Sequence, residues 1–90
     1  MLFRSAVELF PNPVKRNGVL TIHWKKPVSN DQQMILYNTA GVKLLQIVIL
    51  ANKSLQQAQV NLDLQAAGYY IIQVIDTKTH DKQVVSFIVE

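Results

Sequence analysis

Residues 63–75 read Asp-Leu-Gln-Ala-Ala-Gly-Tyr-Tyr-Ile-Ile-Gln-Val-Ile, and this stretch decides the fold. Turn-forming and small residues lead through Gly68 into a run of β-branched and aromatic residues, which favours a strand. Gly68 suits a tight corner before the strand because glycine adopts positive φ without steric cost. Alternation along the strand predicts three side chains in the core, namely Tyr70, Ile72 and Val74.

The opposite face of this predicted strand is unusually apolar, since it carries Tyr69, Ile71 and Ile75. A sheet face that contacts only water normally carries polar residues. We therefore predict either a central strand that is covered on both faces or a face that contacts a partner. One candidate partner is a second copy of the chain, bound through these three side chains as a homodimer.

Similar apolar runs, separated by turn residues, recur along the whole chain. Two prolines in Pro11-Asn12-Pro13 restrict φ and remove backbone donors, so they predict a rigid corner after the first strand. Asn38-Thr39-Ala40-Gly41 has the composition of a hairpin turn. The strands that we predict are residues 7–10, 19–24, 33–37, 43–50, 59–64, 69–75 and 82–89.

Three segments carry more specific expectations. Residues 25–31 contain two lysines and a proline and are predicted to form a polar loop. Residues 44–50 are so apolar that we expect burial on both faces or contact with a partner. Residues 55–59 have the propensity for a helical turn, but the period-two alternation of residues 59–64 favours a strand there.

Seven short strands without a convincing helix predict an all-β fold, an immunoglobulin-like antiparallel β-sandwich. With 90 residues and no internal repeat or linker-like tract, the chain is expected to form a single domain over residues 1–90. Hydrophobic residues make up 49% of the sequence and charged residues only 17%, which is a composition of folded rather than disordered chains.

Composition and charge argue against several classes of protein. The net charge is +3, but the only adjacent basic pairs are Lys15-Arg16 and Lys25-Lys26, and neither lies beside a row of aromatic residues that could stack on bases. Nucleic-acid binding is therefore not expected. The absence of cysteine excludes disulfides and thiolate metal sites. No segment has the roughly 20 apolar residues of a membrane span, and residues 1–8 lack a signal-peptide core.

The sequence contains no recognisable catalytic pattern. His23 and His80 are far apart in the sequence and lack the spacing of metal ligands. The six acidic residues form no general acid and base pair, no serine lies in a nucleophile elbow, and the three glycines are isolated. We therefore expect a protein without enzymatic activity, cofactor or metal.

Four segments carry a resemblance to a known family. They are Leu9-Phe10-Pro11-Asn12-Pro13; residues 35–45 with Tyr37, Asn38, Gly41 and Lys43; residues 62–72 with Gly68 and Tyr70; and Lys82-Gln83-Val84-Val85. In this order and at this spacing, they resemble the C-terminal sorting domains of the type IX (Por) secretion system of Bacteroidetes. The resemblance runs from residue 9 to residue 90.

The resemblance implies a non-catalytic sorting signal at the C-terminal end of a longer cargo protein. Such a domain passes through the periplasm, after export by a signal peptide that lies elsewhere, and is recognised by the outer-membrane type IX translocon. A sortase-like enzyme usually removes the domain and attaches the cargo to the cell surface, although some members keep it. The expected final location is the outer-membrane surface or the medium.

Strand addition at an open sheet edge is one way in which a partner could recognise such a domain. Our hypothesis places this surface on residues 82–89 together with the hairpin at residues 38–43. The alternative function is an accessory extracellular β-sandwich for adhesion, carbohydrate binding or spacing. A carbohydrate module would need exposed aromatic residues, for which the candidates are Trp24, Tyr37 and Tyr69, and Trp24 is expected in the core.

Overall fold

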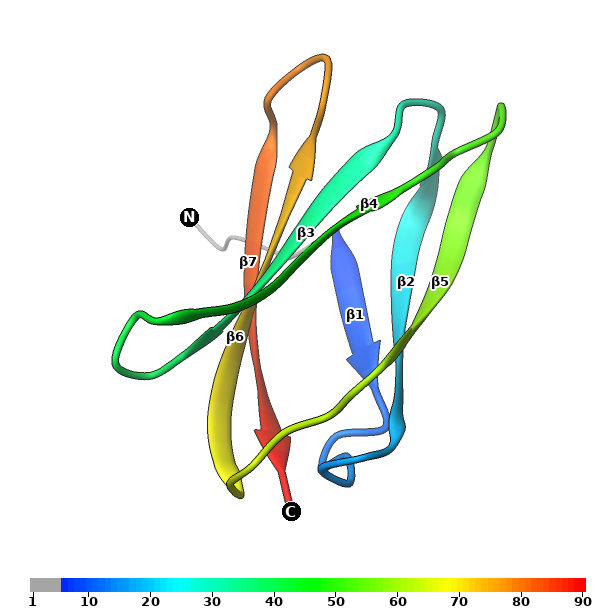
Figure 1. The fold of residues 1–90 in the computed structure, drawn as a ribbon. Coiled ribbons are helices and arrows are strands. Elements are labelled where there is room, and N and C mark those ends of the chain that lie inside the picture. Colours follow the sequence, from blue (N-terminus) through cyan, green and yellow to red (C-terminus); the bar gives the residue numbers. More distant parts are fainter. Residues whose placement is uncertain (1–5) are drawn as a thin grey trace, which may run out of the picture.

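The computed structural model describes residues 6–90, which form seven β-strands in two packed sheets (Figure 1). Residues 1–5, part of the segment in which the sequence shows no signal-peptide core, lie outside the described residues. The strands are β1 (Val7–Phe10), β2 (Val19–Val28), β3 (Gln32–Asn38), β4 (Lys43–Ile49), β5 (Leu55–Asn61), β6 (Gly68–Asp76) and β7 (Lys82–Val89). The predicted all-β, immunoglobulin-like sandwich is confirmed, and residues 6–90 contain no helix.

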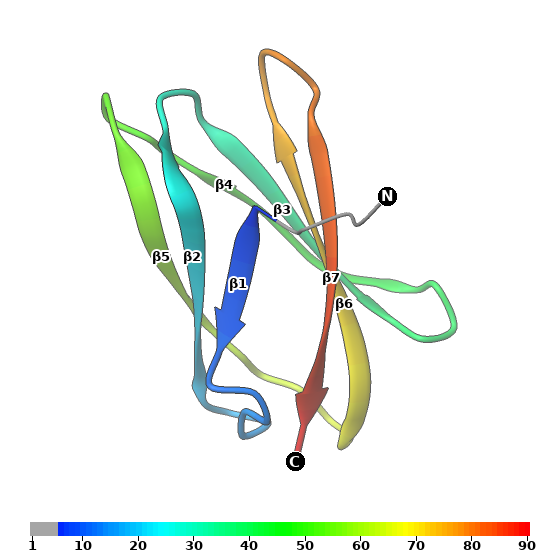
Figure 2. The ribbon, with the colours of Figure 1, turned by 180° about the vertical axis from the view of Figure 1, so that it is seen from behind.

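The two sheets have the strand orders β1-β2-β5 and β4-β3-β6-β7, and every neighbouring pair is antiparallel (Figures 1 and 2). β6 is central in the four-stranded sheet, between β3 and β7. β4 stays beside β3, because the hairpin turn at residues 39–42 returns the chain to the same sheet. β6 is therefore a central strand, but Tyr69, on the side away from the core, is 63% exposed. The expected cover on both faces was wrong, and contact of this side with a partner stays a prediction.

The core lies between the sheets and follows the predicted alternation. Tyr70, Ile72 and Val74 of β6 are all at most 6% exposed. The three-stranded sheet contributes Leu20, Ile22 and Trp24, and Trp24 is buried as expected. Further buried side chains from the other strands and from the β1–β2 connection are Val7, Leu9, Val14, Met34, Leu36, Leu55, Val60, Phe87 and Val89.

A tyrosine corner fixes the connection that carries the chain from β5 in one sheet to β6 in the other. The Tyr70 hydroxyl donates a 2.6 Å hydrogen bond to the carbonyl oxygen of Ala66, four residues earlier, which is the arrangement known from immunoglobulin-like sandwiches. The Tyr70 ring packs against Phe87, with 6.0 Å between ring centroids. Gly68 has a φ of +136°, so the corner requires a glycine at this position.

A polar cluster joins the two turns at the other end of the four-stranded sheet. The Asp76 carboxylate accepts 2.9 Å hydrogen bonds from the backbone N–H groups of Thr79 and Lys78. It also accepts from Nε2 of Gln32, which is only 3% exposed, and from Nδ2 of Asn30. Led by the Thr79 bond, these bonds lower the pKa of Asp76 from 3.8 to about 2.

Two of the predicted strands differ from the observed strands by more than one residue at an end. Residues 25–28 continue β2 instead of forming a loop, and Pro27 fits there because the β2–β5 register is interrupted between His23 and Val28. The fifth strand is Leu55–Asn61 rather than residues 59–64. Leu62 and Leu64 leave the sheet because their N–H groups donate to the carbonyls of Gly18 and Arg16 in the β1–β2 connection.

Residues 44–50 are not buried on both faces, so the first of the two alternatives expected for them was wrong, and contact with a partner stays a prediction. β4 is an edge strand of its sheet. Leu45, Ile47 and Ile49 pack partly buried against the core, whereas Val48 is 56% exposed and Leu50, just after the strand, is 61% exposed. The sequence shows how apolar a strand is, but the pairing of other strands decides whether it lies at an edge.

The tyrosine corner gives the first testable prediction. Tyr70→Phe keeps the ring but removes the hydrogen bond to Ala66, so we expect the free energy of unfolding to fall by about 1 kcal/mol. Tyr69→Phe is the matched control, because Tyr69 is 63% exposed and its hydroxyl has no hydrogen-bond partner within residues 6–90. Chemical denaturation measures both variants. Equal stability of the two variants would contradict the role of the corner.

The Asp76 cluster gives a pH-dependent prediction. Because the pKa of Asp76 is lower in the folded chain than in the unfolded chain, its carboxylate stabilises the fold above about pH 4, and this contribution disappears as the pH falls toward 2. Asp76→Asn should therefore lower the free energy of unfolding at pH 7, by an amount that shrinks between pH 4 and 2. Denaturation at stepped pH measures the difference. Asp63→Asn, at an exposed carboxylate without a hydrogen bond within residues 6–90, serves as the control at pH 7.

Candidate recognition surface

The predicted Pro11-Asn12-Pro13 corner joins the two sheets. Oδ1 of Asn12 accepts a 2.9 Å hydrogen bond from the backbone N–H of Ile88 in β7. Val14 continues this contact, because its N–H donates to the carbonyl of Ile88 and its carbonyl accepts from the N–H of Glu90, both at 2.9 Å. The corner therefore fastens the β1–β2 connection along the end of β7.

The residues of the predicted hairpin turn stabilise the turn itself. Oδ1 of Asn38 accepts a 2.9 Å hydrogen bond from the N–H of Val42, and the carbonyl of Asn38 accepts a 3.0 Å bond from Gly41. Gly41 has a φ of +82°, which favours glycine. The hairpin between β3 and β4 projects beyond the body of the sandwich (Figures 1 and 2).

The remaining motif residues share one face of the four-stranded sheet, on the side away from the core. These are Tyr37, Lys43, Lys82 and Val84. Tyr37 lies opposite Lys43 on β4 and opposite Ile71 on β6, and its hydroxyl lies 3.4 Å from Oε1 of Gln73. Lys82 and Lys43 lie on the two edge strands, β7 and β4, at opposite corners of the face.

We call this side of the four-stranded sheet, which points away from the core, the outer face. The pairing of the strands shows which residues belong to it. Its apolar and aromatic members are Ile35, Tyr37, Val48, Tyr69, Ile71, Ile75, Val84 and Ile88. Its polar, uncharged members are Gln33, Gln46, Gln73 and Ser86. The only charged members are the two corner lysines, and Nζ of Lys43 donates a 2.8 Å hydrogen bond to Oε1 of Gln46.

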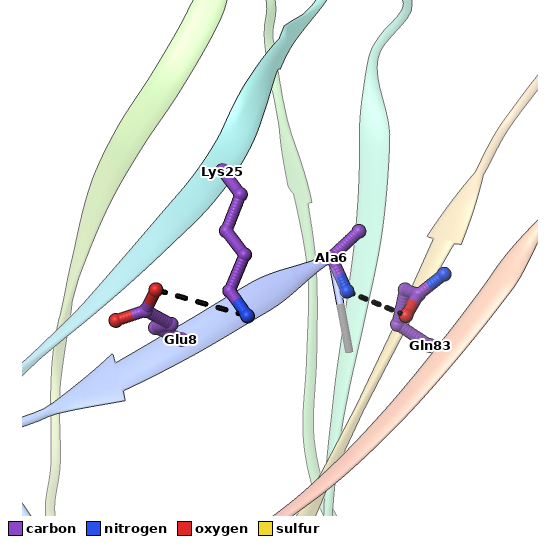
Figure 3. Close-up of polar contacts among 4 residues, drawn as sticks. All are labelled: Ala6, Glu8, Lys25 and Gln83. Atoms are coloured by element: carbon purple, nitrogen blue, oxygen red, sulfur yellow. Dashed lines mark hydrogen bonds and ion pairs between the residues drawn. The ribbon is translucent and has the colours of Figure 1, made fainter. Parts of the chain in front are cut away.

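The outward face of the three-stranded sheet has a different character. Nζ of Lys25 lies 3.9 Å from Oε1 of Glu8 there, so this face carries both signs of charge (Figure 3). The rest of that face is mostly polar and includes Thr21, His23, Gln57, Gln59 and Asn61. The outer face of the four-stranded sheet is therefore the side of the sandwich that is largely apolar and nearly uncharged.

The free edge of β7, which we predicted as a site for strand addition, is partly occupied. Asn12 and Val14 bond the backbone of residues 88–90 at one end. At the other end, Oε1 of Gln83 accepts a 3.1 Å hydrogen bond from the N–H of Ala6 (Figure 3). The contacts to the backbone of residues 88–90 occupy one end of the edge and shorten the length that is available to an added strand.

No cluster of three or more potential metal-ligating side chains occurs within residues 6–90. His23 lies half-buried on β2, with its ring 6.5 Å from that of Phe10, and His80 is exposed in the β6–β7 turn. A shallow, open pocket of about 300 Å³ lies between the hairpin and the tyrosine corner, lined by Asn38, Leu44, Asp63, Leu64, Gln65, Ala66 and Tyr70.

Comparisons with known proteins agree with this picture. A family model described as the secretion system C-terminal sorting domain matches residues 8–90. Among solved structures, the fold is similar to part of PorZ from Porphyromonas gingivalis, an essential bacterial surface component of the type IX secretion system, with a TM-score of 0.72 and 21% identity. The match covers 93% of this chain but only 11% of the PorZ chain. No curated protein sequence matches significantly.

The Pro11-Asn12-Pro13 corner gives a local prediction. Asn12→Ala removes the side-chain acceptor for the Ile88 N–H, so we expect the Ile88 amide to lose protection against hydrogen exchange while the amides of β6 keep theirs. The free energy of unfolding should fall by about 0.5–1 kcal/mol. Asn61→Ala, at an exposed position on β5, is the control. Unchanged exchange at Ile88 would show that the corner does not hold β7.

Proposed function

Because this chain belongs to the family of secretion system C-terminal sorting domains, we propose that it directs a cargo protein by presenting a folded surface to the export machinery. It is a sorting signal of the type IX secretion system, which exports proteins across the outer membrane of Bacteroidetes to the cell surface or the medium. Domains of this family are in general not catalytic.

The single observation that carries the function is the extent of the family match. Residues 8–90 include all but the first residue of β1 and the whole of the other six strands. The matched unit is therefore the complete sandwich rather than a short peptide signal. This extent supports a signal that is read in its folded form.

The structure separates the motif residues by role. Asn12, Asn38, Gly41, Gly68 and Tyr70 hold the backbone through hydrogen bonds or special φ values. Lys43, Lys82 and Val84 are exposed, and Tyr37 lies beside them on the outer face, half-buried. We assign recognition by the translocon to these four residues and a structural role to the others, together with Pro11 and Pro13.

The remaining steps of the proposed pathway rest on the family relationship. Residues 1–90 would form one domain at the C-terminal end of a longer cargo protein. A signal peptide elsewhere in that protein would bring it to the periplasm, and a sortase-like enzyme would then remove the domain at the surface. Within residues 6–90, no helix is long and apolar enough to cross a membrane.

The alternative function, an accessory module for adhesion, carbohydrate binding or spacing, has weaker support. A carbohydrate platform needs several exposed aromatic rings. Trp24 is 3% exposed and belongs to the core, and Tyr37 is half-buried, which leaves Tyr69 as the exposed candidate among the three. Phe10 is also exposed, but it lies on the three-stranded sheet and Tyr69 on the four-stranded sheet, so these two rings do not form one platform.

Secretion of a reporter tests the proposal. A periplasm-directed fluorescent protein fused to residues 1–90 should reach the cell surface or medium of a Bacteroidetes host only when the type IX translocon works. Lys43→Glu combined with Lys82→Glu should reduce this export, because it reverses both charges of the outer face.

The matched control is Lys15→Glu combined with Lys26→Glu, which makes the same change in net charge at exposed positions away from the outer face. Its export should equal that of the unchanged fusion. Periplasmic retention of the unchanged fusion in both strains would reject the sorting function. If both double variants were exported equally, the role of Lys43 and Lys82 in recognition would be rejected, but the sorting function would not.

A further inference from the structure

We propose that the whole outer face is a docking surface for a flat surface of another protein, one with an uncharged centre and carboxylates opposite Lys43 and Lys82. This inference rests on the proposed sorting function and specifies the chemistry of the partner. Its members come from four strands that are far apart in sequence but adjacent in the sheet, β4-β3-β6-β7.

Exposure and composition single out this face. Tyr69, Val84 and Val48 are 63%, 58% and 56% exposed, and Ile88 is 37% exposed. The face holds twelve uncharged side chains and two lysines, counted from the fourteen members defined above. An uncharged surface with charges only at two corners is typical of protein interfaces, whose buried part is depleted in charged residues.

Charge argues against a second copy of this chain as the occupant. The face carries two lysines and no carboxylate, so a facing copy would offer no opposite charge to either corner. The acidic residues that flank these four strands, Asp31, Asp76, Asp81 and Glu90, lie at or just beyond strand ends. The Asp76 carboxylate already accepts four side-chain and backbone donors, and Asp31 accepts from the N–H of Ala51.

The size of the face leads to the same conclusion. Four strands about 4.8 Å apart, each about seven residues long at about 3.3 Å per residue, cover a flat area on the order of 450 Å². A stable protein interface buries about 800 Å² on each partner. The outer face alone is therefore too small for a stable dimer, and its size suits a transient contact that releases the domain after export.

A membrane surface fits the face less well than a protein does. Binding to anionic lipid through side-chain charge typically needs clusters of about four to eight basic residues. The outer face has two lysines, at opposite corners. A flat sheet also lacks the deep apolar side of an amphipathic helix, which inserts between headgroups.

The test places one carboxylate on each edge strand of the face, at Val48 of β4 and at Val84 of β7. Val48→Glu combined with Val84→Glu alters two side chains that are 56% and 58% exposed, so folding should tolerate both changes. Export of the reporter fusion should fall at least about tenfold, because an unpaired carboxylate in a buried contact costs more than the ~1.4 kcal/mol equivalent to a factor of ten.

The matched control is Phe10→Glu combined with Val19→Glu, which adds the same charge at two side chains that are each 44% exposed on the three-stranded sheet. Its export should stay within about twofold of the unchanged fusion, a factor that corresponds to about 0.4 kcal/mol. Equal melting temperatures and periplasmic amounts of both double variants confirm that the difference arises in recognition. Equal export of both double variants would overturn the docking surface while leaving the sorting function intact.

Two measurements on the purified domain separate the other occupants. Sedimentation equilibrium should find a monomer. A dimer that dissociates when Val48→Glu and Val84→Glu are introduced would overturn the inference and show that the face binds a second copy of the chain. Co-sedimentation with phosphatidylglycerol-containing vesicles should find no binding. Vesicle binding that the same double variant abolishes would overturn the inference and show that the face binds a membrane. If the unchanged fusion is not exported in a translocon-dependent way, the sorting function and this inference both fail.

Discussion

The hydrogen bond from the Tyr70 hydroxyl to the carbonyl of Ala66 is the constraint on which the arrangement of the sheets depends. The chain must leave β5 in one sheet and enter the centre of the other, and this bond fixes the point and direction of entry. β6 then serves as a template for β3 on one side and β7 on the other. An error of one residue at the corner would exchange the core face of β6 with its outer face.

Local chemistry made part of the fold predictable from the sequence. Val7–Phe10 and Lys82–Val89 were predicted to the residue, because prolines or polar turns bound each alternating run. Residues 25–28 were not, since a lysine pair and a proline suggest a loop unless the register of the neighbouring strands is known. The edge position of β4 could not be predicted from the sequence either, because it depends on which strands pair with each other.

The candidate surface was predictable only in outline. The apolar side chains of Tyr69, Ile71 and Ile75 predicted that the second face of β6 is covered or contacts a partner. The residues beside them, such as Val48 on β4 and Ile88 on β7, became part of the same surface through strand register, which no local pattern encodes. Motif residues were equally ambiguous, because the sequence alone does not distinguish an asparagine that caps a turn from one that binds a partner.

The contacts of residues 6–14 with β7 also bear on how the domain responds to force. Ala6 is bonded beside the beginning of β7 and Val14 beside its end, so the two segments run in the same direction. Tension between Ala6 and the end of β7 would load these contacts in shear, and several would have to break together. A domain pulled through a narrow channel from its N-terminal side would therefore resist unravelling strand by strand.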